Sequence, residues 1–145
     1  MTIIESIRNF ILKCPYLDEF NEGLGRKKVG VDFLSDEIES YSIEEVPAGP
    51  IIKRYTDGSS LRQIIFVFSS RECYGENVLQ NLDNIGFYHK FSEWLEEQTE
   101  NDNLPIIQNG TSQKIEALTN GYAFDTDVNK ARYQIQVKLT YIKDK

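Results

Sequence analysis

The side chains able to perform acid–base or nucleophilic chemistry are few and scattered. Cys14 and Cys73 are the only cysteines in the 145 residues, and His89 is the only histidine. A thiol–imidazole pair needs mutual contact and a third group that orients the base. Nothing in the spacing of Cys73 and His89 implies contact. We therefore interpret Cys73 as structural and His89 as a surface residue, and we expect no catalytic residue.

Metal and phosphate sites are weakly supported by the sequence. Residues 125–129 match the first ligand positions of an EF-hand loop, but Lys130 replaces the required glycine and Gln136 the final glutamate. One histidine and two distant cysteines fall short of the four ligands of a zinc site. The Gly-containing basic segment 23–28 lacks the spacing of a P-loop. The sequence predicts no metal and no cofactor.

Charge and hydropathy disfavour a protein that wraps nucleic acid and a protein that spans a membrane. Sixteen basic and 23 acidic side chains give a net charge of −7, which suits a nucleic-acid-wrapping protein poorly. No stretch approaches the roughly 20 apolar residues that span a bilayer. Residues 1–5 lack both a basic region and an unbroken apolar run, so we expect no signal peptide, no membrane partner and synthesis in the cytosol.

Two acidic clusters, within 36–45 and 93–102, remain after this search. We interpret them as solvated faces. If copies of the chain form a ring, the same clusters could line a channel that repels DNA and lets it slide.

The first half of the sequence predicts one helix followed by strands. A capping box at Thr2 and Glu5 begins a helix over 2–14, which Pro15 ends. The segment 64–68 is apolar on both faces, so we expect its strand to be central with both sides covered. The predicted strands of this half are 29–34, 40–46, 51–55 and 60–70.

The second half predicts helices and then strands. Residues 76–99 have a helical period, and Gly86 indicates a bend or a break between two helices. Two long strands follow at 113–124 and 131–142, joined by a turn at 125–129. The order predicts one α+β domain over 1–145, with a mostly antiparallel β-sheet and α-helices packed on one face.

Two segments are candidates for an assembly interface. Residues 47–60 combine two prolines, a basic pair and a turn signal, and they form either a docking arm or an ordinary hairpin packed on its own domain. The candidate residues of this segment are Lys53, Arg54, Tyr55 and Asp57. A second docking candidate is the basic loop of Arg26, Lys27 and Lys28, which is otherwise a flexible loop.

The order of short motifs along nearly the whole chain resembles one known family. Examples are CPYL at 14–17, PIIKRYTDGSS at 50–60, FVFSSRE at 66–72 and GYAFD at 121–125. These motifs are similar to those of small minor structural proteins encoded by phages and prophages of Gram-positive bacteria. Within that group the chain resembles tail terminator proteins.

This resemblance implies a structural role without catalysis or a cofactor. It implies a small α+β domain whose copies form a ring, expected to be a hexamer, at the head-proximal end of a tail tube. The ring would stop tube polymerisation and offer a surface to the head. The implied partners are further copies of the chain, the tail tube protein, head–tail connector proteins, and a sheath or collar protein if the tail is contractile. Genomic DNA would pass through the lumen without specific binding, and the chain would reside in the virion after assembly in the host cytoplasm.

Two alternatives stay open at this point. The chain could instead be a head-completion or connector protein on the capsid side. It could also be a small enzyme of unknown chemistry, which the scarcity of acid, base and metal-ligand clusters makes a remote choice.

Overall fold

Two long central strands, β4 (Ser60–Cys73) and β7 (Lys130–Lys143), organise the fold. They pair antiparallel over their whole length, with Ser60 opposite Lys143 and Cys73 opposite Lys130. This pairing is seen in a computed structural model that describes residues 2–20, 29–31, 40–73, 78–126 and 130–145. The predicted central position of the strand that begins at Ser60 is confirmed.

Shorter strands line both edges of this central pair. β2 (Ser40–Val46) and β3 (Ile51–Arg54) pair antiparallel with successive parts of β4. β5 (Gly110–Ala117) and β6 (Tyr122–Thr126) do the same along β7. β1 (Val29–Val31) pairs with β2 in parallel at the outer edge. The predicted, mostly antiparallel sheet is therefore confirmed.

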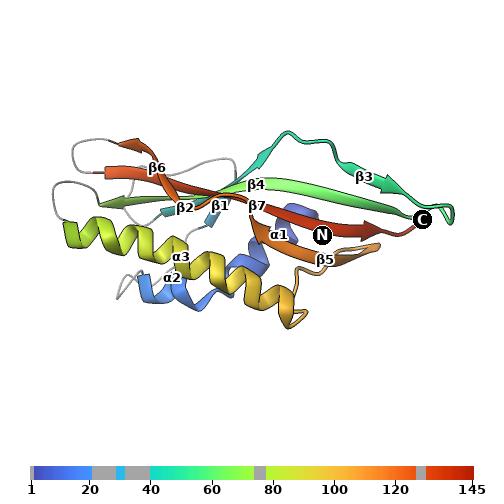
Figure 1. Ribbon diagram of the computed structural model, residues 1–145, viewed down its shortest axis with the longest axis horizontal. Helices are drawn as coiled ribbons and strands as arrows, with labels where there is room; N and C mark the ends of the chain where they lie inside the picture. Colours follow the sequence, from blue (N-terminus) through green and yellow to red (C-terminus); the bar gives the residue numbers. More distant parts are fainter. Residues whose placement is uncertain (1, 21–28, 32–39, 74–77, 127–129) are drawn as a thin grey trace.

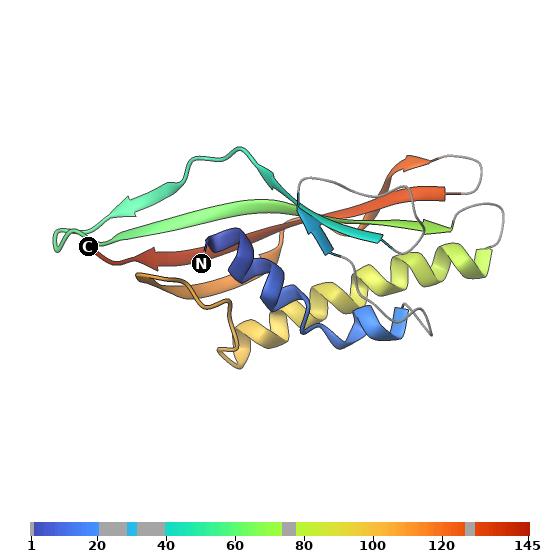
Figure 2. The same cartoon turned by 180° about the vertical axis from the view of Figure 1, so that it is seen from behind.

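The three described helices lie together on one face of the sheet (Figures 1 and 2). They are α1 (Ile3–Ile11), α2 (Pro15–Phe20) and α3 (Val78–Glu100). The fold is thus α+β with helices on one face, as the sequence predicts. None of the described helices is long and apolar enough to cross a lipid bilayer.

Aromatic side chains fill the space between the helices and the sheet. The ring of Phe68 on β4 lies 4.8 Å from that of Phe91 on α3, and 5.6 Å from that of Tyr41 on β2. On α1, the ring of Phe10 lies 4.8 Å from that of Trp94 on α3. Aromatic pairs at these distances add about 0.5–1.5 kcal/mol each beyond the area they bury. The predicted alternation of β7 is also confirmed, because its inward side chains are all buried: Tyr133, Ile135, Val137, Leu139 and Tyr141.

The opposite face of the sheet is polar and carries no described helix (Figure 1). Arg132 on β7 donates to Glu44 on β2, and Glu116 on β5 accepts from Lys114 at 2.7 Å. Val67 is buried on this face, whereas Ile65 is half-exposed. The expectation that both sides of this strand are covered holds on the helix face, where Phe66 and Phe68 are buried, and only in part on the polar face.

The N-terminal helix begins as predicted but ends earlier. Thr2 Oγ1 accepts from the amide of Glu5 at 3.2 Å, which is half of a capping box. α1 ends at Ile11, and Pro15 is the first residue of α2 rather than the end of a longer helix. Proline suits that position because its missing N–H would find no intrahelical acceptor there.

The predicted break at Gly86 is wrong, because α3 continues through it. A Cβ added at Gly86 would meet nothing within 4 Å, so there is open space beside the glycine. Its cost to the helix is the low helix propensity of glycine. In the first half of α3 one apolar side chain points outward and one polar side chain inward. Leu82 is 61% exposed, and Asn84 is buried instead.

The predicted strand 113–124 is two strands separated by residues 118–121. Leu118 still donates to the carbonyl of Gln136 at 2.7 Å, and Thr119 Oγ1 accepts from the amide of Gln136 at 3.2 Å. These bonds hold the chain beside β7 while it changes direction. β6 then pairs with β7 as the predicted hairpin, although residues 127–129 of its turn lie outside the described part of the chain.

The outer edge of β5 is closed by one side chain of α3. Thr99 Oγ1 donates to the carbonyl of Ile115 at 2.8 Å and accepts from the Ile115 amide at 3.2 Å. Both backbone groups point away from β7 and would otherwise be open to another strand. Thr99 therefore satisfies the outward backbone groups of Ile115 and connects the end of α3 to the sheet by hydrogen bonds.

We predict that Thr99→Val destabilises the protein by about 1–2 kcal/mol, because the isosteric valine leaves the Ile115 amide and carbonyl without partners. Urea unfolding measures this change. Thr111→Val, at an exposed position of the same strand, is the matched control and should stay within about 0.5 kcal/mol of the parent. Equal stability of the two variants would refute the role of Thr99.

Gly121 is required because the backbone there lies against Tyr88. A Cβ at this position would overlap Cβ and Cγ of the fully buried Tyr88 ring. The Tyr88 hydroxyl donates to the carbonyl of Tyr133 at 3.1 Å, so its 2.6 Å bond to Ser70 must have the serine as donor. Burial raises the pKa of Tyr88 well above its ordinary value. These bonds fix the ring and prevent it from moving aside.

We expect opposite effects from alanine at two glycines. Gly121→Ala should destabilise the protein by about 1–3 kcal/mol through overpacking against Tyr88. Gly86→Ala should stabilise it by about 0.5–1 kcal/mol, since it adds helix propensity in open space. Thermal unfolding compares the two, and a Gly121→Ala variant as stable as the parent would contradict the packing described above.

Candidate functional site

The candidate docking segment is a hairpin built on the edge of β4. Lys53 lies opposite Leu61 and Arg54 opposite Ser60, with a register shift at Ile52. Before β3, Gln63 donates from its backbone amide to the carbonyl of Pro50 at 2.9 Å. The segment therefore packs on its own sheet through its backbone, as an ordinary hairpin does. We call residues 51–59 the β3 arm.

The turn of the β3 arm is fixed by Asp57. One carboxylate oxygen accepts from the hydroxyl of Ser59 at 2.6 Å and from its backbone amide at 2.8 Å. The hydroxyl bond, followed by the amide bond, lowers the pKa of Asp57 below its ordinary value. Gly58 has a φ of +95°, a conformation that L side chains rarely adopt, and its Cα faces the side chain of Lys145. The tip is thus a defined turn.

The side chains of the β3 arm project into solvent. Lys53, Arg54 and Asp57 are exposed, and Lys53 Nζ lies 5.5 Å from the centre of the Tyr55 ring in a cation–π contact. Lys143 pairs with Ser60 beside the arm, and the end of the chain lies at the turn (Figure 1). This end of the sheet therefore gathers four basic side chains, Lys53, Arg54, Lys143 and Lys145, beside two acidic ones, Asp57 and Asp144.

Several of the residues singled out in the sequence lie outside the described part of the chain or form no cluster with one another. The basic loop of Arg26, Lys27 and Lys28 and the acidic segment 36–39 lie in undescribed parts of the chain. His89 is exposed on α3, as predicted, while the side chain of Cys73 is not described. In the described residues, no three His, Cys, Asp or Glu side chains are grouped so that they could hold a metal ion.

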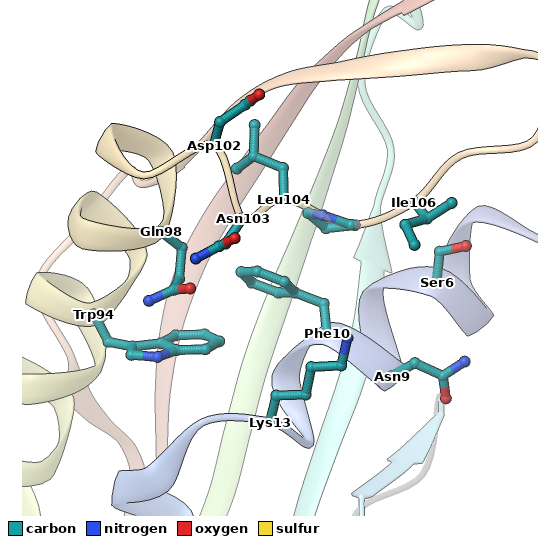
Figure 3. A pocket seen from close by; sticks show the side chains of 11 residues that line it. Ser6, Asn9, Phe10, Lys13, Trp94, Gln98, Asp102, Asn103, Leu104 and Ile106 are labelled. Carbon is teal, nitrogen blue, oxygen red and sulfur yellow. The ribbon is translucent and has the colours of Figure 1, made fainter.

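A pocket of about 770 Å³ opens between α1, the end of α3 and the segment that follows it (Figure 3). Phe10 and Trp94 form its base and are both nearly buried, whereas Ile106 at its edge is 80% exposed. The other apolar lining residues are Leu104 and Pro105. Its polar lining residues are Ser6, Asn9, Lys13, Gln98, Asp102 and Asn103.

The chain matches no model of a known protein family and no curated protein. The site must therefore be interpreted from its own chemistry. The described surface offers a basic arm with a rigid turn and an apolar pocket with a mixed polar rim.

The pocket was missed by sequence reasoning, while the β3 arm was found. Lys53, Arg54 and the turn at Asp57 are neighbours in the sequence, so composition alone reveals them. The pocket joins residues from α1 with residues nearly ninety positions later, and no local pattern links them. The one available signal was the run at 104–107, where apolar residues leave the helix without an alternating pattern.

We predict that Ser59→Ala returns the pKa of the Asp57 carboxyl toward its ordinary value, because the hydroxyl that stabilises the carboxylate is removed. A carboxyl-carbon NMR titration measures this. Because folding lowers the pKa, the contribution of Asp57 to stability is present above the unfolded pKa and is lost as pH falls through the folded one.

Thr56→Ala is the control for this titration, since Thr56 is not among the groups that shift the carboxyl. It should leave the lowered pKa of Asp57 in place. An Asp57 pKa that Ser59→Ala does not change would mean that the turn is not held by this serine.

Proposed function

We propose that this chain is a structural virion protein whose copies form a ring, expected to be a hexamer, at the head-proximal end of a phage or phage-like tail tube. There it stops tube polymerisation and provides the interface for joining the head. The resemblance of its motifs to tail terminator proteins supports this proposal from the sequence. The observation that carries it from the structure is the β3 arm, a rigid hairpin whose basic side chains make few contacts within the chain.

The shape of the subunit supports a head-to-tail assembly. A ring needs two different complementary surfaces on each subunit, so that the same contact repeats until it closes. The β3 arm forms part of one edge of the sheet, whereas the helices cover one face (Figures 1 and 2). Two chemically different surfaces are therefore available.

The edges of the sheet favour contacts through side chains. On the β5 edge, Thr99 hydrogen-bonds the backbone amide and carbonyl of Ile115. On the β3 edge, Lys53, Arg54 and a register shift discourage the addition of another strand. A proline, Pro50, lies immediately before β3. Subunits joined in this way can form a ring of defined size, whereas continuing strand pairing tends toward open polymers.

The first test is deletion of the gene, followed by electron microscopy of the particles. We expect overlong tail tubes that are not attached to heads, because loss of the stop leaves polymerisation unchecked. Tails of normal length beside unjoined heads would assign the chain to the capsid side as a head-completion or connector protein. Intact infectious particles would refute both structural roles.

A second test reverses the charge of the β3 arm. We expect Lys53→Glu with Arg54→Glu to lower the yield of joined particles about tenfold or more, which corresponds to about 1.4 kcal/mol of lost binding. Complementation of the deletion strain measures the yield.

The matched control is Lys90→Glu with Lys114→Glu, which makes the same change in net charge at two exposed positions away from the arm. The control should preserve particle yield, and both double variants should unfold near the parent temperature. Equal losses in the two double variants would assign the effect to net charge and not to the arm.

A further inference from the structure

The pocket beside α1 has the composition of a protein-binding site. Its base is aromatic, with the rings of Phe10 and Trp94 4.8 Å apart, and Ile106 stands exposed at its edge. Pockets of roughly 300–1,000 Å³ bind ligands in general, and exposed apolar residues around an aromatic base are typical of interface anchors. The pocket therefore offers buried apolar area to a side chain from outside the chain.

The end of α3 beside this pocket carries excess negative charge. Glu96, Glu97 and Glu100 are exposed near the C-terminus of the helix, and Asp102 follows in the pocket lining. The last turn holds no basic residue. Acidic groups at this end of a helix interact unfavourably with its dipole. A cationic partner placed here would relieve that repulsion.

The β3 arm has the complementary chemistry. Its basic pair, Lys53 and Arg54, lies between two exposed apolar side chains, Ile52 at 46% and Tyr55 at 37% exposure. Lys53 and Arg54 are consecutive strand residues and project to opposite faces, so each face of the arm carries one basic group near an exposed apolar one. The pocket lining contains one acidic residue, Asp102, and the glutamates at the end of α3 lie outside that lining. Lys13 is the one basic residue of the pocket lining, and it lies in the segment that follows α1, across the pocket from Gln98 on α3 (Figure 3).

A single copy cannot fill its own pocket with its own arm. The arm is hydrogen-bonded along the edge of β4, within the sheet, whereas the pocket lies between α1 and the end of α3 on the face that the helices cover (Figures 1 and 2). Its pairing with β4 keeps the arm at that edge. An arm that enters this pocket therefore belongs to another copy.

We propose that the pocket of one copy receives the β3 arm of a second copy, with the apolar side chains of the arm against Phe10, Trp94 and Ile106. The basic side chain on the facing side of the arm then lies near Asp102 and the acidic end of α3. This contact is head-to-tail, so its repetition closes a ring. The inference rests on the proposed function, because it supplies the contact between neighbouring ring subunits.

Site-specific cross-linking tests this contact. Thr56→Cys places a thiol beside the tip of the arm, and Asn103→Cys places one in the pocket, while both leave the proposed apolar and charged groups intact. The control pair combines Thr56→Cys with Asp83→Cys, an exposed position near the other end of α3. Both are treated with a short bismaleimide, in assembled particles and as concentrated full-length protein, with the parent chain as background.

We expect a ladder of covalent multimers from the arm–pocket pair and only background from the control pair. Cross-linking no stronger than the control, in particles that contain the protein as a ring, would overturn this contact and leave the proposed function standing. A chain that is absent from particles and monomeric when concentrated would overturn both proposals.

A charge exchange gives an independent readout. Glu97→Lys with Glu100→Lys should reduce the fraction of assembled subunits about tenfold, and combining it with Lys53→Glu and Arg54→Glu should restore assembly. Asp83→Lys combined with the same arm variant is the control and should not restore it. Rescue by the control, or none by the acidic pair, would show that the arm binds elsewhere or that the pocket holds a different ligand.

Discussion

The long antiparallel pairing of β4 with β7 is the constraint on which the other parts of the structure depend. Each of these strands is fourteen residues long, and each carries two shorter strands along its outer edge. The pairing sets which side chains face the helices, because a shift of one residue would turn every side chain of a strand to the other face. Phe68 and Ile135, opposite each other in the register, are therefore both placed in the core.

Because the sheet has two chemically different faces, the residues that stabilise the fold differ from those that are exposed for docking. The aromatic packing between α3 and the sheet uses one face. The polar face and the β3 arm contribute little to this core, so their side chains can vary with little cost in stability. Lys53 and Arg54 lie on a strand whose backbone is fully anchored to β4 while their side chains stay in solvent. An arm of this kind enters a complex already ordered, which limits the entropy lost on binding.

Much of the fold could be predicted from the sequence because local patterns determined it. The alternation of β7, the strand at 40–46 and the turn at Asp57 and Gly58 are all set by neighbouring residues. The failures have non-local causes. Gly86 looks like a helix break in sequence, but the helix passes it because one glycine costs a helix only about 0.5–1 kcal/mol, while Phe87, Tyr88 and Phe91 just after it are buried in the core. The burial of Asn84 and the exposure of Leu82 depend on where α3 meets the sheet, which no periodicity reveals.

The division of residues 113–124 into two strands has a similar origin. Thr119 and Leu118 bond to Gln136 across the gap, so the interruption is stabilised by β7 and not by a turn signal of its own. The pocket is the extreme case, because it exists only once α1 has packed against the end of α3. Sequence reasoning could find the arm and not the pocket for this reason.

The register of the central pair also has a consequence for how the chain reaches its fold. Every β4 residue pairs with a β7 residue dozens of positions later, with α3, β5 and β6 between them in the chain. Non-local pairing of this kind slows folding, because the entropy of closing a large loop is lost before the stabilising contacts between the strands form. On the ribosome, the apolar segment Ile64 to Phe68 emerges well before its partner strand. Production of the chain thus depends on keeping this segment from aggregating until β7 has been synthesised.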